Sequence, residues 1–142
     1  MNQPPLQRCR EAHAGILLAL DNASHAANRP DPVRLLAVSK TRTAAEVAAL
    51  AETGQRAFGE NYVQEALPKV EALRELGLEW HLIGHLQSNK ADAAARSFDW
   101  VQSLDRPRLV AVLARHRPAG LPPLNVLLLT LAMQNSAVTQ FH

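Results

Sequence analysis

Lys40 is the residue of this sequence whose type and position most clearly predict chemistry. It directly follows the short apolar run 34–39, which is bounded by turn-forming residues and is typical of a strand buried on both faces. Desolvation at the end of such a strand favours the neutral amine, which can attack an aldehyde. The alternative is a lysine at the rim that reaches solvent, and the spacing alone leaves both interpretations open.

Further polar residues stand at the ends of the next predicted strands, and they are Glu60, Asn61, His85 and Ser103. Because the carboxyl ends of parallel strands meet at one edge of a sheet, where ligands bind, we expect these groups to converge with Lys40. Glu60 is a candidate acid or base. Asn61 either contacts a ligand or caps a helix that starts there, with a glutamine at the capping-box spacing.

His81 and His85 stand four residues apart, a spacing that on a helix would place both imidazoles on one face for a metal ion. They flank a predicted strand, however, in which four residues separate side chains by about 13 Å, so we expect no shared metal ion. His81 is interpreted as a hydrogen-bonded core or edge histidine, and His85, past Gly84, as the candidate for ligand contact. Residues 87–90 open the next helix, whose amides could hold an anion, although capping by Ser88 explains the same residues.

The elements that must position these residues alternate regularly along the chain. The patterns predict a helix over 5–27, strands over 34–39, 55–59, 80–83, 100–103 and 125–129, and helices over 44–54, 61–76, 86–97 and 105–117. A capping box from Thr43 to Glu46 starts the second helix, and Asp105 is the expected cap of the last. Strand–helix alternation at about 20–26 residues predicts a parallel sheet built of right-handed βαβ units.

Two α/β architectures share this alternation, the open doubly wound sheet and the closed eightfold barrel. The open sheet usually carries a glycine-rich turn after its first strand, and none follows 34–39. The segment 54–59 resembles a phosphate-binding loop only in its glycines, because Glu60 and Asn61 stand where Lys and Ser or Thr are required. The sequence therefore favours an α/β fold with an N-terminal helix and about five βα units of a TIM-type barrel, which is incomplete.

Composition excludes several classes of protein. Of 142 residues, 47% are hydrophobic and 20% charged, which is typical of a globular domain rather than a disordered chain. The net charge is only +2 and there is no run of Lys or Arg, so nucleic-acid binding is not expected. The single cysteine, Cys9, leaves no internal disulfide. No apolar stretch approaches the roughly 18 residues of a membrane helix and no signal peptide is recognisable, so we expect a cytoplasmic protein without membrane contact.

Three segments, LAVSKT (36–41), FGENYVQE (58–65) and WHLIGHLQSNK (80–90), resemble signatures of the pyridoxal phosphate homeostasis protein family in order and spacing. The resemblance implies a barrel like the N-terminal domain of alanine racemase. It also implies that pyridoxal 5'-phosphate (PLP) is held as an internal aldimine on Lys40, with Asn61 near the ring and His85 as a further contact. The implied role is storage of the cofactor and delivery to PLP-dependent apo-enzymes, without catalytic turnover.

The resemblance runs from about residue 5 to Leu127, and residues 129–142 depart from the family pattern. We interpret the chain as a C-terminally truncated barrel domain, divided into a helix and linker (1–32), βα units (33–128) and an out-of-family tail (129–142). The family's phosphate-gripping loops would then be missing, which would weaken cofactor binding. The first and fifth strands would expose edges for self-association. The alternatives are a racemase-like enzyme that uses Lys40, which would need a second acid or base from another domain, and a non-functional fragment.

Overall fold

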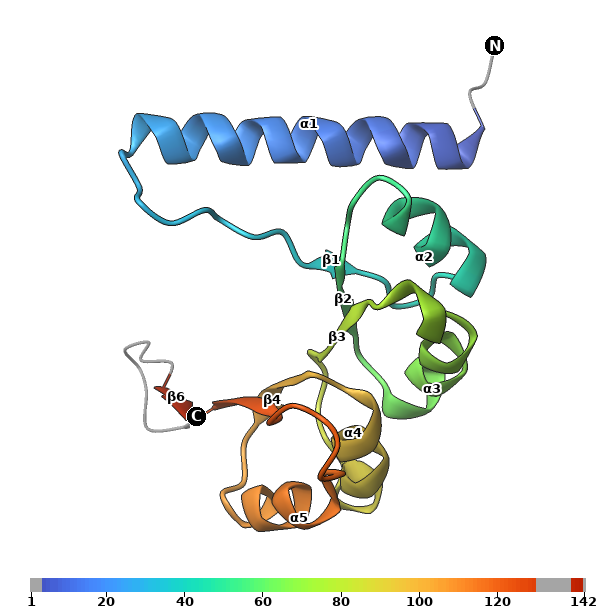
Figure 1. The fold of residues 1–142 in the computed structure, drawn as a ribbon, viewed down its shortest axis with the longest axis vertical. Helices are drawn as coiled ribbons and strands as arrows, with labels where there is room; N and C mark the ends of the chain where they lie inside the picture. The colour runs from blue at the N-terminus through green and yellow to red at the C-terminus, as the bar shows by residue number, and fades with distance from the viewer. Residues whose placement is uncertain (1–3, 130–138, 142) are drawn as a thin grey trace.

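The computed structural model describes residues 4–129 and 139–141 of the chain (Figure 1). The helices are α1 (Pro5–Ala26), α2 (Ala44–Ala51), α3 (Val63–Ala72), α4 (Ala91–Ser97) and α5 (Arg108–His116), with the 3₁₀ turns η1 (Arg74–Leu76) and η2 (Ser88–Lys90). The strands are β1 (Ala37–Val38), β2 (Ala57–Glu60), β3 (Glu79–Leu82), β4 (Trp100–Leu104), β5 (Asn125–Leu128) and β6 (Thr139–Phe141). The predicted alternation of strands and helices is confirmed.

The strands of the sheet follow one another in chain order, from β1 to β6, and the first five run parallel. A helix connects each parallel strand to the next, and α2 to α5 lie along one side of the curved row of strands (Figure 1). This arrangement is the repeated βα unit of a TIM-type barrel. Five such strands leave the barrel incomplete, as the sequence predicts.

The core lies between the sheet and the helices. Phe58, Leu82 and Val101 come from three neighbouring strands and are each at most 1% exposed. Ala91, Ala94 and Ala95 of α4 are fully buried against them, because small side chains let this helix approach the sheet closely. The opposite face of the sheet is less covered, since Trp100 is only half-buried and Val38 is 52% exposed.

The first strand differs from the prediction. The expectation of a strand over 34–39 buried on both faces is wrong, because strand pairing is confined to Ala37 and Val38. β1 is the edge strand of the sheet and pairs only with β2 among the strands described. With one neighbour and an uncovered face, it does not receive the burial that its apolar sequence indicates.

The helix starts agree only in part with the predicted caps. Glu46 Oε2 accepts a hydrogen bond from the Thr43 amide at 2.8 Å, and the Thr43 hydroxyl accepts one from the Glu46 amide, so the capping box is confirmed. The predicted caps Asn61, Ser88 and Asp105 are wrong, because α3, α4 and α5 begin further along the chain without a side-chain cap. These three residues instead contact neighbouring strand ends.

β6 pairs antiparallel with β5, with Leu127 opposite Gln140. The prediction of an open edge on the fifth strand is therefore wrong, since β6 supplies the hydrogen-bonding partner. The predicted open edge of β1 is confirmed for the described residues.

The N-terminal helix α1 packs against α2 and the segment that leads into β2. Arg10 lies 2.6 Å from Glu52, and the buried His13 ring lies 2.9 Å from the side-chain oxygen of Gln55. Leu18 on its outer side remains 61% exposed. Within the described part of the chain, neither α1 nor any other helix has the length and hydropathy needed to cross a membrane.

Candidate functional site

The segments that carry Lys40, Asn61 and His85 follow β1, β2 and β3 directly. Because these strands are parallel and adjacent, the three segments lie at the same edge of the sheet and in chain order. The predicted convergence of the strand ends is thereby confirmed.

Close packing joins the ends of β2, β3 and β4. Gly84, just past β3, lies so near the backbone of Asn61 that an added Cβ would overlap the Asn61 carbonyl group. The Ser103 hydroxyl donates a hydrogen bond to the Gly84 carbonyl from the other side. Gly84 is therefore enclosed between its two neighbours, and the backbone of Asn61 is fixed by this contact rather than by helix capping.

Lys40 lies in a tight turn and is exposed to solvent. The Arg42 amide donates to the Ser39 carbonyl at 3.0 Å, and Thr41 has a φ of 64° in the left-handed region. This conformation is rare for a β-branched residue and costs about 1–2 kcal/mol. Of the two interpretations of Lys40, the structure supports the lysine at the rim that reaches solvent, because the turn follows an edge strand with an uncovered face.

A buried ion pair lies next to this turn. Lys69 Nζ, from α3, is 2.7 Å from Glu60 Oε1 and donates to the Ser39 carbonyl at 3.0 Å. The Ser39 hydroxyl donates to the same carboxylate oxygen at 2.6 Å. Glu60 is 0% exposed and Lys69 is 9% exposed. Glu60 thus has no contact with solvent. This burial does not suit the acid or base role for which the sequence makes Glu60 a candidate.

Lys69 is a residue of this region that the sequence motifs do not single out. It lies on the face of α3 that also buries Val63 and Ala66. A cation on the apolar face of a helix requires a buried acidic partner, and this is the signal that could have found it. The second carboxylate oxygen, Glu60 Oε2, is buried and has no hydrogen-bond partner among the residues that the structure describes.

His85 belongs to a polar cluster with Asp105 and Arg106. Its Nδ1 lies 3.5 Å from Asp105 Oδ2, and its Nε2 lies 3.4 Å from an Arg106 nitrogen. Desolvation alone would raise the pKa of Asp105, but the hydrogen bond from Arg106 and the charges of Arg106 and His85 hold it below its ordinary value. The His85 side chain is 59% exposed, so it is open to a ligand while its neighbours orient it.

A small pocket of about 120 Å³ adjoins His85 between the loops that follow β2 and β3. All but one of its lining residues carry polar side chains, and the lining consists of Tyr62, Val63, Gln64, His85, Gln87 and Lys90. The predicted helix start at 87–90 is here the three-residue turn η2, in which the Ser88 hydroxyl accepts a hydrogen bond from Arg106 at 3.3 Å. His85 and the residues that follow Asn61 thus line the same pocket.

His81 is a buried, hydrogen-bonded histidine, on the face of the sheet opposite the helices. Its Nε2 lies 2.7 Å from the Glu79 carboxylate, and its Nδ1 accepts from the Gln102 amide at 2.8 Å. Burial lowers the pKa of His81, although the hydrogen bond to Glu79 opposes that shift. Both ring nitrogens are engaged within β3 and β4, away from the partners of His85. Within the described residues, no three His, Cys, Asp or Glu side chains are grouped so that they could hold a metal ion.

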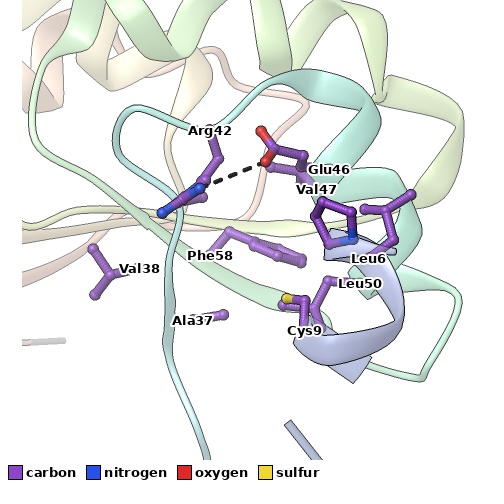
Figure 2. A pocket seen from close by; sticks show the side chains of 11 residues that line it. Leu6, Cys9, Ala37, Val38, Arg42, Glu46, Val47, Leu50 and Phe58 are labelled. Carbon is purple, nitrogen blue, oxygen red and sulfur yellow. Dashed lines mark ion pairs between the residues drawn. The ribbon is translucent and has the colours of Figure 1, made fainter. Parts of the chain in front are cut away.

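A separate pocket of about 280 Å³ lies between α1, α2, β1 and β2 (Figure 2). Most of the side chains around it are apolar, and they include Leu6, Cys9, Val47, Leu50 and Phe58. Arg42 and Glu46 form an ion pair of 3.6 Å beside it. Lys40, Asn61 and His85 do not line this pocket. The pocket lies beside α1 and α2, and Ser39 and Arg42 from the turn that carries Lys40 are among its lining residues.

The sequence profile of the alanine racemase N-terminal domain matches residues 19–130. The chain belongs to this family. The pyridoxal phosphate homeostasis protein of Escherichia coli K12 is 51% identical over 115 residues, which cover 76% of this chain and 49% of that protein. The protein of the same name from Pseudomonas aeruginosa is 51% identical over 116 residues, covering 81% and 50%. The chain thus spans about half the length of the curated relatives it matches.

Two solved structures extend this comparison. PipY of Synechococcus elongatus, with PLP bound, is 42% identical and has a TM-score of 0.57 over 68% of this chain and 47% of that one. An unknown protein from Bifidobacterium adolescentis is 28% identical, with a TM-score of 0.70 over 81% of this chain and 51% of that one. The resemblance and the incomplete barrel fold are confirmed. The individual roles of Lys40, Asn61 and His85 stay predictions.

Proposed function

We propose that this chain binds pyridoxal 5'-phosphate at Lys40 and serves the homeostasis of that cofactor without catalytic turnover. The single observation that carries the proposal is the exposed Lys40 amine on a tightly held turn at the carboxyl edge of the sheet. The names of the relatives support it, and so does the cofactor bound by PipY, at 42% identity.

The lysines of the chain differ in how accessible they are to an aldehyde ligand. PLP supplies an aldehyde carbon that a primary amine can attack. Of the three lysines, Lys40 is exposed, Lys90 is half-buried and Lys69 is engaged in the buried ion pair. A side chain at the exposed rim can be reached by an aldehyde that arrives from solvent. Lys40 is therefore the lysine best placed to react.

Asn61 and His85 would contact the cofactor beside Lys40. The packing of Gly84 against Asn61 fixes the backbone from which the Asn61 amide projects. His85 is held by Asp105 and Arg106 while more than half of its side chain stays exposed. An amide and an imidazole can both donate hydrogen bonds to oxygen atoms of the cofactor.

A carrier role fits this chain better than a racemase role. A racemase of this type needs a second acid or base on the opposite face of the cofactor, commonly a tyrosine from a second domain. The sequence holds one tyrosine, Tyr62, which is 63% exposed and stands in the same domain as Lys40. We infer storage of PLP in the cytoplasm and its delivery to PLP-dependent apo-enzymes.

The domain boundaries at 32 and 128 and the self-association stay predictions.

Reductive trapping tests the proposal. The purified chain is incubated with PLP, reduced with borohydride and digested, and the pyridoxyl group is located by mass spectrometry. We expect the label on Lys40, its loss in Lys40→Ala and its retention in the matched Lys90→Ala variant. A folded wild-type chain without label on Lys40 would exclude cofactor binding there and favour the non-functional fragment. Racemisation of alanine by the same sample would contradict the carrier role.

A further inference from the structure

We propose that Lys69 is a positioning residue for Lys40 and acts through Ser39 and Glu60. The inference rests on the proposed function, because it concerns the presentation of the amine that would bind the cofactor. Lys69 is only 9% exposed, and its Nζ already bonds the Glu60 carboxylate and the Ser39 carbonyl. It therefore acts on the rim through the backbone rather than by touching a ligand.

The contacts of Ser39 fix the first end of the turn. Its carbonyl accepts hydrogen bonds from Lys69 Nζ and from the Arg42 amide, both at 3.0 Å. Its hydroxyl donates to Glu60 at 2.6 Å, and its amide donates to the Gly59 carbonyl at 2.9 Å. Every polar group of Ser39 is thus engaged, and the residue cannot turn without breaking a buried contact.

The capping box fixes the second end of the turn. The amide of Thr43 donates to the Glu46 carboxylate at 2.8 Å, and the Glu46 amide donates back to the Thr43 hydroxyl at 3.2 Å. Between the two fixed ends, Thr41 keeps a φ of 64°. Backbone strain of this kind persists only where the surroundings over-determine it, and it clusters at functional sites. The network at Ser39 and the capping box together supply that constraint on Lys40.

Stability alone does not account for the buried ion pair. Glu60 Oε2 has no hydrogen-bond partner in the described part of the chain, and a buried oxygen in that state carries a desolvation cost. Buried ion pairs can often be replaced by apolar residues of similar volume without loss of stability. What the pair does provide is a direct link from α3 to the residue that precedes Lys40.

A double variant separates positioning from folding. Glu60→Gln combined with Lys69→Met removes both charges at similar volume, so no unpaired charge is buried. It also removes the Nζ donor to Ser39. Trapping with PLP below saturation should then give about tenfold less label on Lys40 per mole of protein than the wild-type chain gives under the same conditions. Circular dichroism and the thermal midpoint should match the wild type.

The outcomes distinguish this inference from the proposed function. A folded double variant with as much Lys40 label per mole of protein as the wild type would overturn the role of Lys69. A wild-type chain without Lys40 label would overturn the proposed function instead. If the double variant does not fold, Lys69→Arg decides, because it keeps a buried cation beside Glu60 but changes the donor that reaches the Ser39 carbonyl. Lower Lys40 label without lower stability in that variant supports positioning, and unchanged label refutes it.

Discussion

The imidazole of His81 stacks on the indole of Trp100, with ring centroids 5.4 Å apart and 3° between the planes. The two residues are direct register partners in β3 and β4. They alternate with the core residues of those strands, so the stack lies on the sheet face opposite the helices. Gln102 donates to Nδ1 and Glu79 contacts Nε2, so both ring nitrogens hold His81 in one orientation.

Lowering the pH below about 6.5 should reduce the free energy of unfolding because of His81. Burial holds its pKa below the ordinary value, although the hydrogen bond to Glu79 opposes that shift. The unfolded chain therefore binds a proton at a higher pH than the folded chain does. The contribution of His81 to stability is full above about pH 6.5. It is lost as the pH falls below that value, with a slope of up to about 1.4 kcal/mol per pH unit. Urea denaturation between about pH 7.5 and 5.5 measures the slope.

His81→Gln should flatten this pH dependence, because glutamine keeps a donor and an acceptor but does not titrate. The matched control is His25→Gln, since the His25 side chain is 78% exposed. Glu79 acts at lower pH: desolvation would raise its pKa, but hydrogen bonds from His81 and Arg34 hold it below the ordinary 4.5. Its stabilisation is therefore lost only as the pH falls below about 4.5. Equal slopes of the free energy of unfolding against pH in the wild type and in His81→Gln would contradict the assignment of this pH dependence to His81.

Gly84→Ala should lower the free energy of unfolding by about 1–3 kcal/mol. The added Cβ would overlap the carbonyl of Asn61, and backbone cannot move aside as a flexible side chain can. Gly120→Ala is the control, because a Cβ there meets no atom within 4 Å. It should change stability by less than about 0.5 kcal/mol. Urea denaturation that shows the same effect for both variants would contradict the close packing at Gly84.

Thr41→Gly should raise the free energy of unfolding by about 1 kcal/mol, because glycine adopts a φ of 64° without a Cβ clash. The control is Asn28→Gly. Asn28 also has a positive φ, of 50°, but asparagine tolerates that region, so we expect a smaller change. Chemical denaturation compares the two. A loss of stability in Thr41→Gly would show that the threonine backbone is not strained.

Self-association through the open edge of β1 is expected at high protein concentration. Val38 stands on this edge strand and is 52% exposed. Because a lysine on an edge strand opposes pairing between chains, Val38→Lys should shift the chain towards the monomer. Leu18→Lys on α1, at a position 61% exposed, should leave the association unchanged. Size-exclusion chromatography with light scattering measures the mass, and a wild-type chain that stays monomeric would refute the expectation.

The order of the elements was predictable because each strand is a short apolar run between turn residues. The extent of β1 was not, since an apolar pattern does not state which strand lies at the edge. Thr43 and Glu46 form a cap within four residues of chain, so local spacing was enough to predict it. Asn61 and Asp105 also have cap-like spacing, but contacts with Gly84 and Arg106 engage them instead.

The placement of Lys40, Asn61 and His85 at one edge follows from the parallel topology alone. Lys69 could not be placed in this way, because its partners Glu60 and Ser39 lie nine and 30 residues away in sequence. Their association depends on how α3 packs on the sheet. The exposure of Lys40 likewise depends on the missing cover over β1, which no local pattern describes.

β6 hydrogen-bonds along β5 in the antiparallel sense, with Leu128 opposite Thr139. Since β4 occupies the other side of β5, β6 lies where the next parallel strand of a closed barrel would pair. An edge can accept only one strand at a time, so β6 and such a parallel strand would compete for the same backbone groups of β5. Pairing of β6 and closure of the barrel are therefore mutually exclusive states of a single edge.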